Sequence, residues 1–87
     1  MALLAVQHAV RDYPAWRAVY DSLDEIQRDW GVTSASVHRL ADAANTVLVL
    51  RHFATAAQAQ GFLTNREVRA AMERAGVEGT PRIEIYA

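Results

Sequence analysis

The chain contains no cysteine and no lysine. The lack of cysteine excludes disulfides, thiolate metal sites and cysteine nucleophiles, so packing or association must stabilise the 87 residues. The only long basic side chains are nine scattered arginines, which stand against ten acidic residues and give a net charge of −1. Because no basic patch exists to meet a phosphate backbone, we expect no nucleic-acid partner.

Long apolar runs are also absent. The longest run near the N-terminus, Ala2 to Val6, is too short for a membrane span or a signal-peptide core, and no basic leader precedes it. We therefore expect a cytoplasmic protein with no membrane partner. No linker, repeat or low-complexity tract interrupts the chain, and its length predicts a single domain over residues 1–87.

Apolar periodicity predicts a βαββαβ order. The strands are expected over 2–10, 32–40, 46–53 and 82–86, with a short hairpin loop at 41–45. A first helix is expected over 13–30, because apolar positions recur at helical spacing after the cap residue Asp12 and stop at Gly31. A second helix is expected from Thr55, with a kink near Thr64-Asn65, to Ala75.

This order predicts an α+β, ferredoxin-like fold: a four-stranded antiparallel sheet in spatial order 4-1-3-2, with both helices on one face. In the third strand, Val47 and Val49 point one way, while Leu48 and Leu50 point the other. We expect those leucines, with Leu4 and Val6 beside them, to form an apolar face that a second copy covers, giving a homodimer packed sheet to sheet. The alternative is a monomer with an exposed apolar sheet.

Three segments resemble a known superfamily. They are the stretch from His8 to Trp16, the hairpin from Asp42 to Asn45, and the stretch from Phe62 to Met72 that is followed by Ala75-Gly76-Val77. Over nearly the whole chain, the sequence resembles the dimeric α/β-barrel proteins of the antibiotic biosynthesis monooxygenase superfamily, including members labelled cyclase-like. The resemblance implies a dimeric α/β barrel, and its members include cofactor-independent oxygenases, polyketide cyclases, lactone isomerases and haem-degrading enzymes.

The chain departs from parts of that family pattern. Oxygenase members use an Asn, Trp and His set, and haem degraders need a His on the second helix, yet no Trp follows Trp30 and no His follows His52. Gln7 could stand for the Asn. We therefore expect no haem and no other bound cofactor, and the case for cofactor-free oxygenation is weakened.

The three histidines do not predict a metal site. His8 and His38 are expected near one end of the sheet with a strand between them, about 9.5 Å apart, while His52 lies at the other end. A single ion holds imidazole nitrogens at about 2.1 Å, so three histidines of one subunit cannot share it. Only ligands contributed across a dimer could complete such a site.

His8 has a different possible partner in the last strand. If Ile83 and Ile85 face the helices, Arg82 and Glu84 face the other side, and we expect them to lie near His8. A histidine beside a carboxylate can act as a base near neutral pH, and an arginine can hold an enolate or phenolate oxygen. We therefore take His8, Arg82 and Glu84 as candidate catalytic residues; the alternative is a polar cluster at the barrel rim.

The aromatic stripe of the helices has two interpretations, a plain core or the lining of a ligand pocket between helices and sheet. In the second interpretation, Gln7, Arg39 and Arg51 point into that layer and supply polar contacts. The candidate ligand-binding residues are Trp16, Tyr20, Gln7, Arg51 and His52.

Two functions remain open on the sequence. The first is a cofactor-independent cyclase, isomerase or monooxygenase that acts on a small hydrophobic, oxygen-rich molecule of aromatic or polyketide-like type. The second is a non-catalytic dimeric module that binds a ligand or a protein. An apolar pocket above about 300 Å³ at His8 or Arg51 would favour the enzyme, whereas a filled interior would favour the module.

Overall fold

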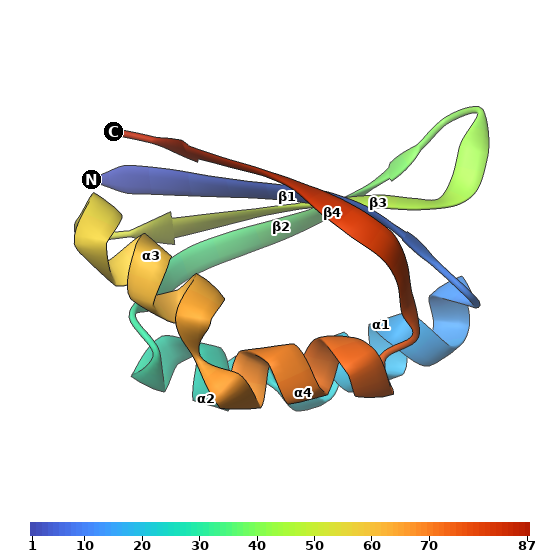
Figure 1. The fold of residues 1–87 in the computed structure, drawn as a ribbon, viewed down its shortest axis with the longest axis horizontal. Helices are drawn as coiled ribbons and strands as arrows, with labels where there is room; N and C mark the ends of the chain where they lie inside the picture. Colours follow the sequence, from blue (N-terminus) through green and yellow to red (C-terminus); the bar gives the residue numbers. More distant parts are fainter.

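The computed structural model describes residues 1–87 as a sheet with all helices on one of its faces (Figure 1). Its elements are β1 (Ala2–Val10), α1 (Tyr13–Ser22), α2 (Asp24–Asp29), β2 (Val32–Leu40), β3 (Ala43–Phe53), α3 (Ala56–Thr64), α4 (Arg66–Arg74) and β4 (Val77–Tyr86). This arrangement confirms the predicted α+β ferredoxin-like fold. None of the helices is both long enough and apolar enough to cross a membrane.

The sheet has the order β2-β3-β1-β4, with every neighbouring pair antiparallel, as predicted. Since β1 and β4 are neighbours, the two termini lie side by side at one end of the sheet, while the β2–β3 hairpin projects beyond the helices at the other (Figure 1). β4 begins five residues earlier than expected and contains Gly79 and Pro81. An edge strand tolerates both residues, because a proline there sacrifices no ladder hydrogen bond.

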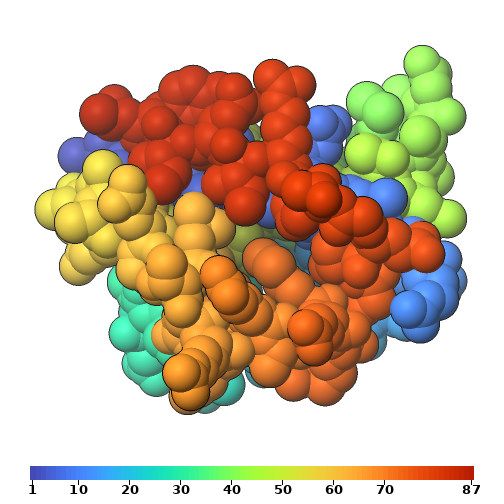
Figure 2. Space-filling view, viewed as in Figure 1, coloured from blue at the N-terminus to red at the C-terminus, as the bar shows by residue number.

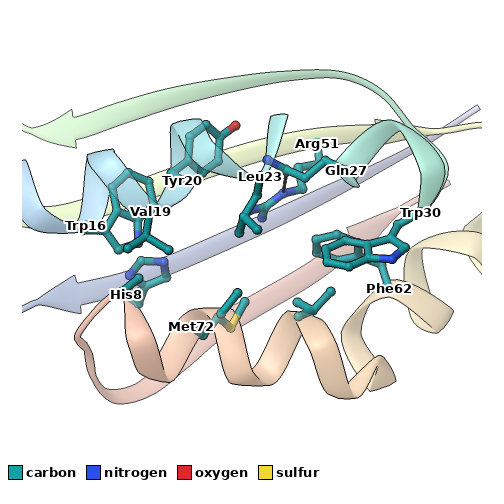
Figure 3. Close-up of a pocket in the computed structure, with 13 residues that line it drawn as sticks. His8, Trp16, Val19, Tyr20, Leu23, Gln27, Trp30, Arg51, Phe62 and Met72 are labelled. Carbon is teal, nitrogen blue, oxygen red and sulfur yellow. Dashed lines mark hydrogen bonds between the residues drawn. The ribbon is translucent and has the colours of Figure 1, made fainter. Parts of the chain in front are cut away.

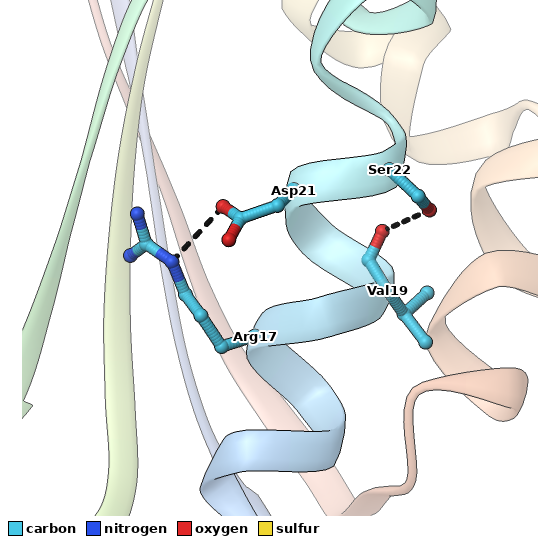
Figure 4. Close-up of polar contacts among 4 residues, drawn as sticks. All are labelled: Arg17, Val19, Asp21 and Ser22. Atoms are coloured by element: carbon cyan, nitrogen blue, oxygen red, sulfur yellow. Dashed lines mark hydrogen bonds and ion pairs between the residues drawn. The ribbon is translucent and has the colours of Figure 1, made fainter.

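The expected helix over 13–30 is broken at Leu23 into α1 and α2. Just before the break, the Ser22 hydroxyl donates a hydrogen bond to the carbonyl oxygen of Val19 at 2.6 Å (Figure 4). A serine that bonds back to its own helix competes with the backbone ladder and bends the helix. On the side of α1 that faces the strands, Arg17 Nε lies 3.0 Å from Asp21 Oδ1 (Figure 4).

The other helix boundaries agree with the capping residues in the sequence. Asp12 accepts a hydrogen bond from the Ala15 amide at 3.2 Å, and Thr55 accepts one from the Gln58 amide at 3.2 Å. The predicted kink lies at Asn65, whose Oδ1 accepts from the Glu67 amide at 2.8 Å and so starts α4. These side chains satisfy amide groups that the first turn of a helix leaves free.

The core lies between the helices and the inward face of β1 and β3. Leu4, Val6, Val47, Val49 and Phe53 are fully buried there. The expectation that Leu4 and Val6 share a face with Leu48 and Leu50 is therefore wrong. The pairing of Val6 with Val49 puts the even residues of β1 on the same face as the odd residues of β3.

The opposite face of the sheet, which we call the open face, carries no helix (Figure 1). Its apolar side chains are half-buried or exposed: Leu3, Ala5, Leu48, Leu50 and Tyr86. The helices also leave part of β4 uncovered on their own side. Ile83 remains exposed, and Figure 2 shows a hollow between β4 and α4.

Candidate functional site

A pocket lies between the helix layer and the sheet, where two clusters of buried side chains meet (Figure 3). One cluster surrounds Phe53 and Phe62, and the other surrounds Trp16 and Val47. The cavity has a volume of about 40 Å³ and ten of its 13 lining residues are hydrophobic. The lining consists of His8, Trp16, Val19, Tyr20, Leu23, Gln27, Trp30, Arg51, Phe62, Val68, Ala71, Met72 and Ala75.

The cavity is well below the size that would by itself favour an enzyme. A volume of 40 Å³ leaves space for a few small groups, whereas pockets for drug-sized ligands reach about 300 Å³ or more. An aromatic ligand can therefore enter only if lining side chains move. Leu23 and Met72 project into the middle of the pocket and are half-buried, and the unbranched Met72 can adopt other rotamers (Figure 3).

His8 occupies one end of the pocket and lies on the helix side of β1 (Figure 3). Its side chain is 6% exposed, and its ring packs against Trp16 with 5.7 Å between centroids. The Nδ1 atom is buried without a hydrogen-bond partner. Burial lowers the pKa of His8 below its ordinary value, and the nearby Arg51 cation lowers it further, so the imidazole is neutral at pH 7.

Arg51 projects from β3 into the same pocket and is 7% exposed. Its Nε donates a hydrogen bond to Gln27 Oε1 at 2.8 Å, and its guanidinium carbon lies 4.9 Å from the centre of the Phe62 ring. Burial lowers the pKa of Arg51 to about 10, and Tyr20 opposes this shift. The side chain therefore remains a cation at neutral pH, and it forms no ion pair, unlike Arg17, Arg28 and Arg82.

Gln27 is the site residue that the sequence analysis missed. It is 5% exposed, whereas its neighbour Ile26, expected to face inward, is exposed. Gln27 lies four residues after Leu23 and seven after Tyr20, so helical spacing places it on the same inward face as the aromatic stripe. This spacing was the available sequence signal, although α2 reads as an ordinary polar segment, DEIQRD.

The aromatic residues of the stripe are both core and lining. Trp16 and Tyr20 stack with 5.1 Å between centroids and 20° between planes, while Trp30 meets Phe62 edge-on at 5.9 Å. The structure thus brings Trp16, Tyr20 and Arg51 together at one pocket. It adds His8, which was expected to lie beside Arg82 and Glu84 instead.

Gln7 and His52 do not reach this pocket. Gln7 pairs with Leu48 and His52 pairs with Leu3, so both lie on the open face, and the expectation that Gln7 points to the helix layer is wrong. His52 Nδ1 is 3.1 Å from Ser34 Oγ. Arg39 does lie on the helix side of β2, but outside the pocket, with its guanidinium carbon 3.9 Å from the centre of the Tyr13 ring.

The expected grouping of His8 with Arg82 and Glu84 is also wrong. In the ladder between β1 and β4, Gln7 pairs with Arg82 and Ala5 pairs with Glu84, so both charges lie on the open face. Arg82 Nε is 3.3 Å from Glu84 Oε1, and the side chains are 71% and 43% exposed. Successive residues alternate between faces, so the thickness of the sheet separates His8 from this ion pair.

The histidines are divided in the same way. His38 pairs with Leu48 and so shares the open face with His52, whereas His8 lies beneath the helices. The Nε2 atom of His38 is 2.9 Å from Ser36 Oγ. No group of three or more side chains of metal-ligand type gathers anywhere in the structure.

Comparison with solved structures gives the fold a family context. An antibiotic biosynthesis monooxygenase superposes with a TM-score of 0.76 at 9% identity, covering 100% of this chain and 97% of that one. SnoaB, a cofactor-independent oxygenase from Streptomyces nogalater, gives 0.79 at 10% identity, covering 99% and 90%. This chain has the antibiotic biosynthesis monooxygenase fold. A conserved protein from Methanosarcina mazei Go1 gives 0.77 at 13% identity, covering 99% and 91%.

At the level of sequence, no family model and no curated protein matches the chain. At 9–10% identity, the similarity to the solved structures shows the fold alone. The chemistry must be argued from the residues of this chain.

Proposed function

We propose that this protein binds a small hydrophobic, oxygen-rich molecule, of aromatic or polyketide-like type, in the pocket between the helices and the sheet. The observation that carries the proposal is the pair of buried polar groups, His8 and Arg51, in a lining that is otherwise mainly apolar and aromatic. A few polar groups set in an apolar concavity are typical of small-molecule sites.

The pocket contains one buried polar atom without a partner, His8 Nδ1, and a cation, Arg51, whose side-chain hydrogen bond goes to Gln27. A buried polar atom without a partner costs about 1–3 kcal/mol, and His8 Nδ1 is such an atom. A ligand with an oxygen at each end of a flat skeleton could meet Arg51 and His8 while its rings contact Trp16 or Phe62. The register places the two side chains four residues apart along the sheet, about 13 Å at the backbone.

A thermal-shift and NMR screen of phenolic and polyketide-like compounds tests the binding site. We expect hits to move the indole signals of Trp16 and Trp30, and His8→Ala to weaken them by about 1–3 kcal/mol. Glu84→Gln, on the open face, is the matched control and should leave binding unchanged. Hits that respond to Glu84→Gln and not to His8→Ala would move the site to the open face, with Arg82 and Glu84 as its catalytic candidates.

Proton transfer is the second candidate function, and the neutral, unpartnered imidazole of His8 favours it. In this step, His8 takes a proton from an acidic C–H bond beside a ligand carbonyl. The electrons of that bond form the enolate, and the proton is returned to carbon or passed to water, while Arg51 holds a second oxygen at the other end of the ligand. Such a step serves cyclase, isomerase or cofactor-free oxygenase chemistry.

Deuterium exchange separates catalysis from binding alone. The probe is 2-tetralone in D₂O, with loss of its C1 proton signal followed by NMR. Exchange faster than in buffer, and abolished in His8→Ala, would establish proton transfer. A protein that binds the ketone without accelerating exchange is the non-catalytic module.

We also propose that a second copy covers the open face and makes the assembly a homodimeric α/β barrel. The half-buried Leu48 and Leu50 and the exposed Tyr86 support this proposal, because they form an apolar surface in the middle of the open face. Sheet-to-sheet packing would remove that surface from water.

A further inference from the structure

We infer that the pocket selects a monoanionic ligand, and that Gln27 is the positioning residue that sets this selectivity by holding Arg51 without neutralising it. The inference deepens the proposed function and depends on it. It assigns the charge of the ligand, which the size and apolar character of the pocket do not determine.

Arg51 has no counter-charge in the pocket. Of the 13 residues that line the pocket, none is acidic. The acids of the neighbouring helix α2 face solvent, and Asp24 lies 3.7 Å from Arg28 on the surface instead. A buried cation with no anion beside it is costly, and natural interiors generally pair such a charge.

Gln27 fixes the position of the Arg51 side chain without adding a charge to the pocket. Its Oε1 accepts one hydrogen bond from Arg51 Nε at 2.8 Å, which uses one of the five N–H donors of a guanidinium. The structure gives the two terminal nitrogens no hydrogen-bond partner. Their four N–H groups suit the two oxygens of a carboxylate or of an enolised dicarbonyl, and the flat group can bind edge to edge.

A glutamate side chain in place of Gln27 (Gln27→Glu) would end this arrangement. It has nearly the same shape, but it would form a buried ion pair with Arg51 and leave the pocket without net charge. With Gln27 the pocket carries one positive charge at neutral pH, because His8 is neutral there. One cation with fixed geometry and no competing acid favours a single negative charge.

Benzoate and its neutral isostere benzamide test the inference, with binding followed through the indole signals of Trp16 and Trp30 in NMR titrations. In the natural protein we expect benzoate to bind at least tenfold more tightly than benzamide. Gln27→Glu should weaken benzoate at least tenfold and leave benzamide within twofold. The matched control, Gln27→Met, preserves length without charge but removes the acceptor for Arg51 Nε, so it should weaken benzoate while keeping a preference for benzoate over benzamide.

The ratio of the two affinities is the deciding quantity, because a merely structural role for Gln27 would weaken both probes together. Equal affinities in the natural protein would overturn the inference, while phenolic ligands that still bind would leave the proposed function standing. A benzoate preference that survives Gln27→Glu would overturn the role of Gln27. Should that variant not fold, Arg51→Gln must abolish the preference, and its persistence would overturn the inference. If neither probe moves either indole signal, the inference fails.

Discussion

The two faces of this sheet treat charge in opposite ways. On the open face, the Arg82–Glu84 ion pair is exposed and neutralised within itself. On the helix-covered face, Arg51 is buried, has no carboxylate partner and is held only by a neutral amide. An exposed ion pair such as Arg82–Glu84 costs the folded chain little, whereas a buried and unpaired cation such as Arg51 destabilises it. The position of Arg51 therefore indicates a binding site and not a contribution to stability.

The faces also differ in how completely their apolar side chains are buried. Val47 and Val49 are fully buried beneath the helices, whereas Leu48 and Leu50, between and beside them on the same strand, are only half-buried. One side of β3 is thus completely buried in the core, while apolar side chains on its other side remain partly exposed to solvent. The helix-covered face should therefore determine the stability of the subunit, and the open face its association.

The largest expected effect concerns the helix-covered face. Phe53→Ala removes a fully buried ring beside Phe62, and we expect the free energy of unfolding to fall by about 3–5 kcal/mol. In the separated subunit, Leu50→Ala on the open face should cost only about 1 kcal/mol, because that side chain is half-buried there. Urea denaturation of both variants measures the two losses of unfolding free energy. Equal losses would contradict the difference between the faces.

Association is the next largest effect and tests the open face. Leu48→Glu places a charge at the centre of the expected dimer interface, and we expect it to raise the dimer dissociation constant on the order of 100-fold. Ala70→Glu adds the same charge on exposed α4 and should leave association unchanged. Sedimentation equilibrium decides the outcome. A natural protein that is monomeric at micromolar concentration would contradict the dimer.

A smaller effect is expected where the helix layer joins the edge strand β2. Gly31 has a φ of +96°, a conformation that side chains with a Cβ atom disfavour, so Gly31→Ala should cost about 1–2 kcal/mol. Gly61 lies within α3 with open space around it, and Gly61→Ala should instead stabilise the fold by about 0.5–1 kcal/mol. Thermal unfolding measures both variants: the Tm should fall for Gly31→Ala and rise for Gly61→Ala if backbone conformation determines both effects.

The smallest effect is a pH dependence confined to the helix-covered face. Because burial lowers the pKa of His8, the unfolded chain binds a proton more readily than the folded one below the ordinary value of 6.5. The contribution of His8 to stability is therefore complete above about pH 6.5 and is lost as the pH falls toward the lowered pKa. His8→Gln should remove this loss, while His52→Gln on the open face should retain it. Urea midpoints at several pH values measure the difference, and two identical profiles would contradict it.

Much of the fold could be predicted from local signals. The alternation in 46–53, the caps at Asp12 and Thr55, and the break at Asn65 all act within a few residues, and the structure places them as expected. The break at Leu23 is different. Just before it, the Ser22 hydroxyl bonds back to Val19, a choice that a polar helix surface leaves open.

The candidate site was predictable only in part. Trp16, Tyr20 and Arg51 could be assigned to the helix layer from their spacing, and they do line the pocket. His8 and Gln7 could not be assigned to their correct faces, because a shift of one residue in register exchanges the two faces of a strand. Gln27 does lie at helical spacing from Tyr20 and Leu23, but a polar side chain at that position does not extend an apolar stripe.

The sequence by itself determined the element order, the antiparallel sheet and the two apolar patterns on its strands, because these follow from the two-residue and 3.6-residue periods of the chain. Only the tertiary structure decided which pattern the helices cover and which groups meet beneath them. Those outcomes depend on the pairing of β1 with β3 and β4, which is set by packing between segments far apart in the chain. The meeting of His8, Gln27 and Arg51 in one pocket is therefore a property of the folded chain.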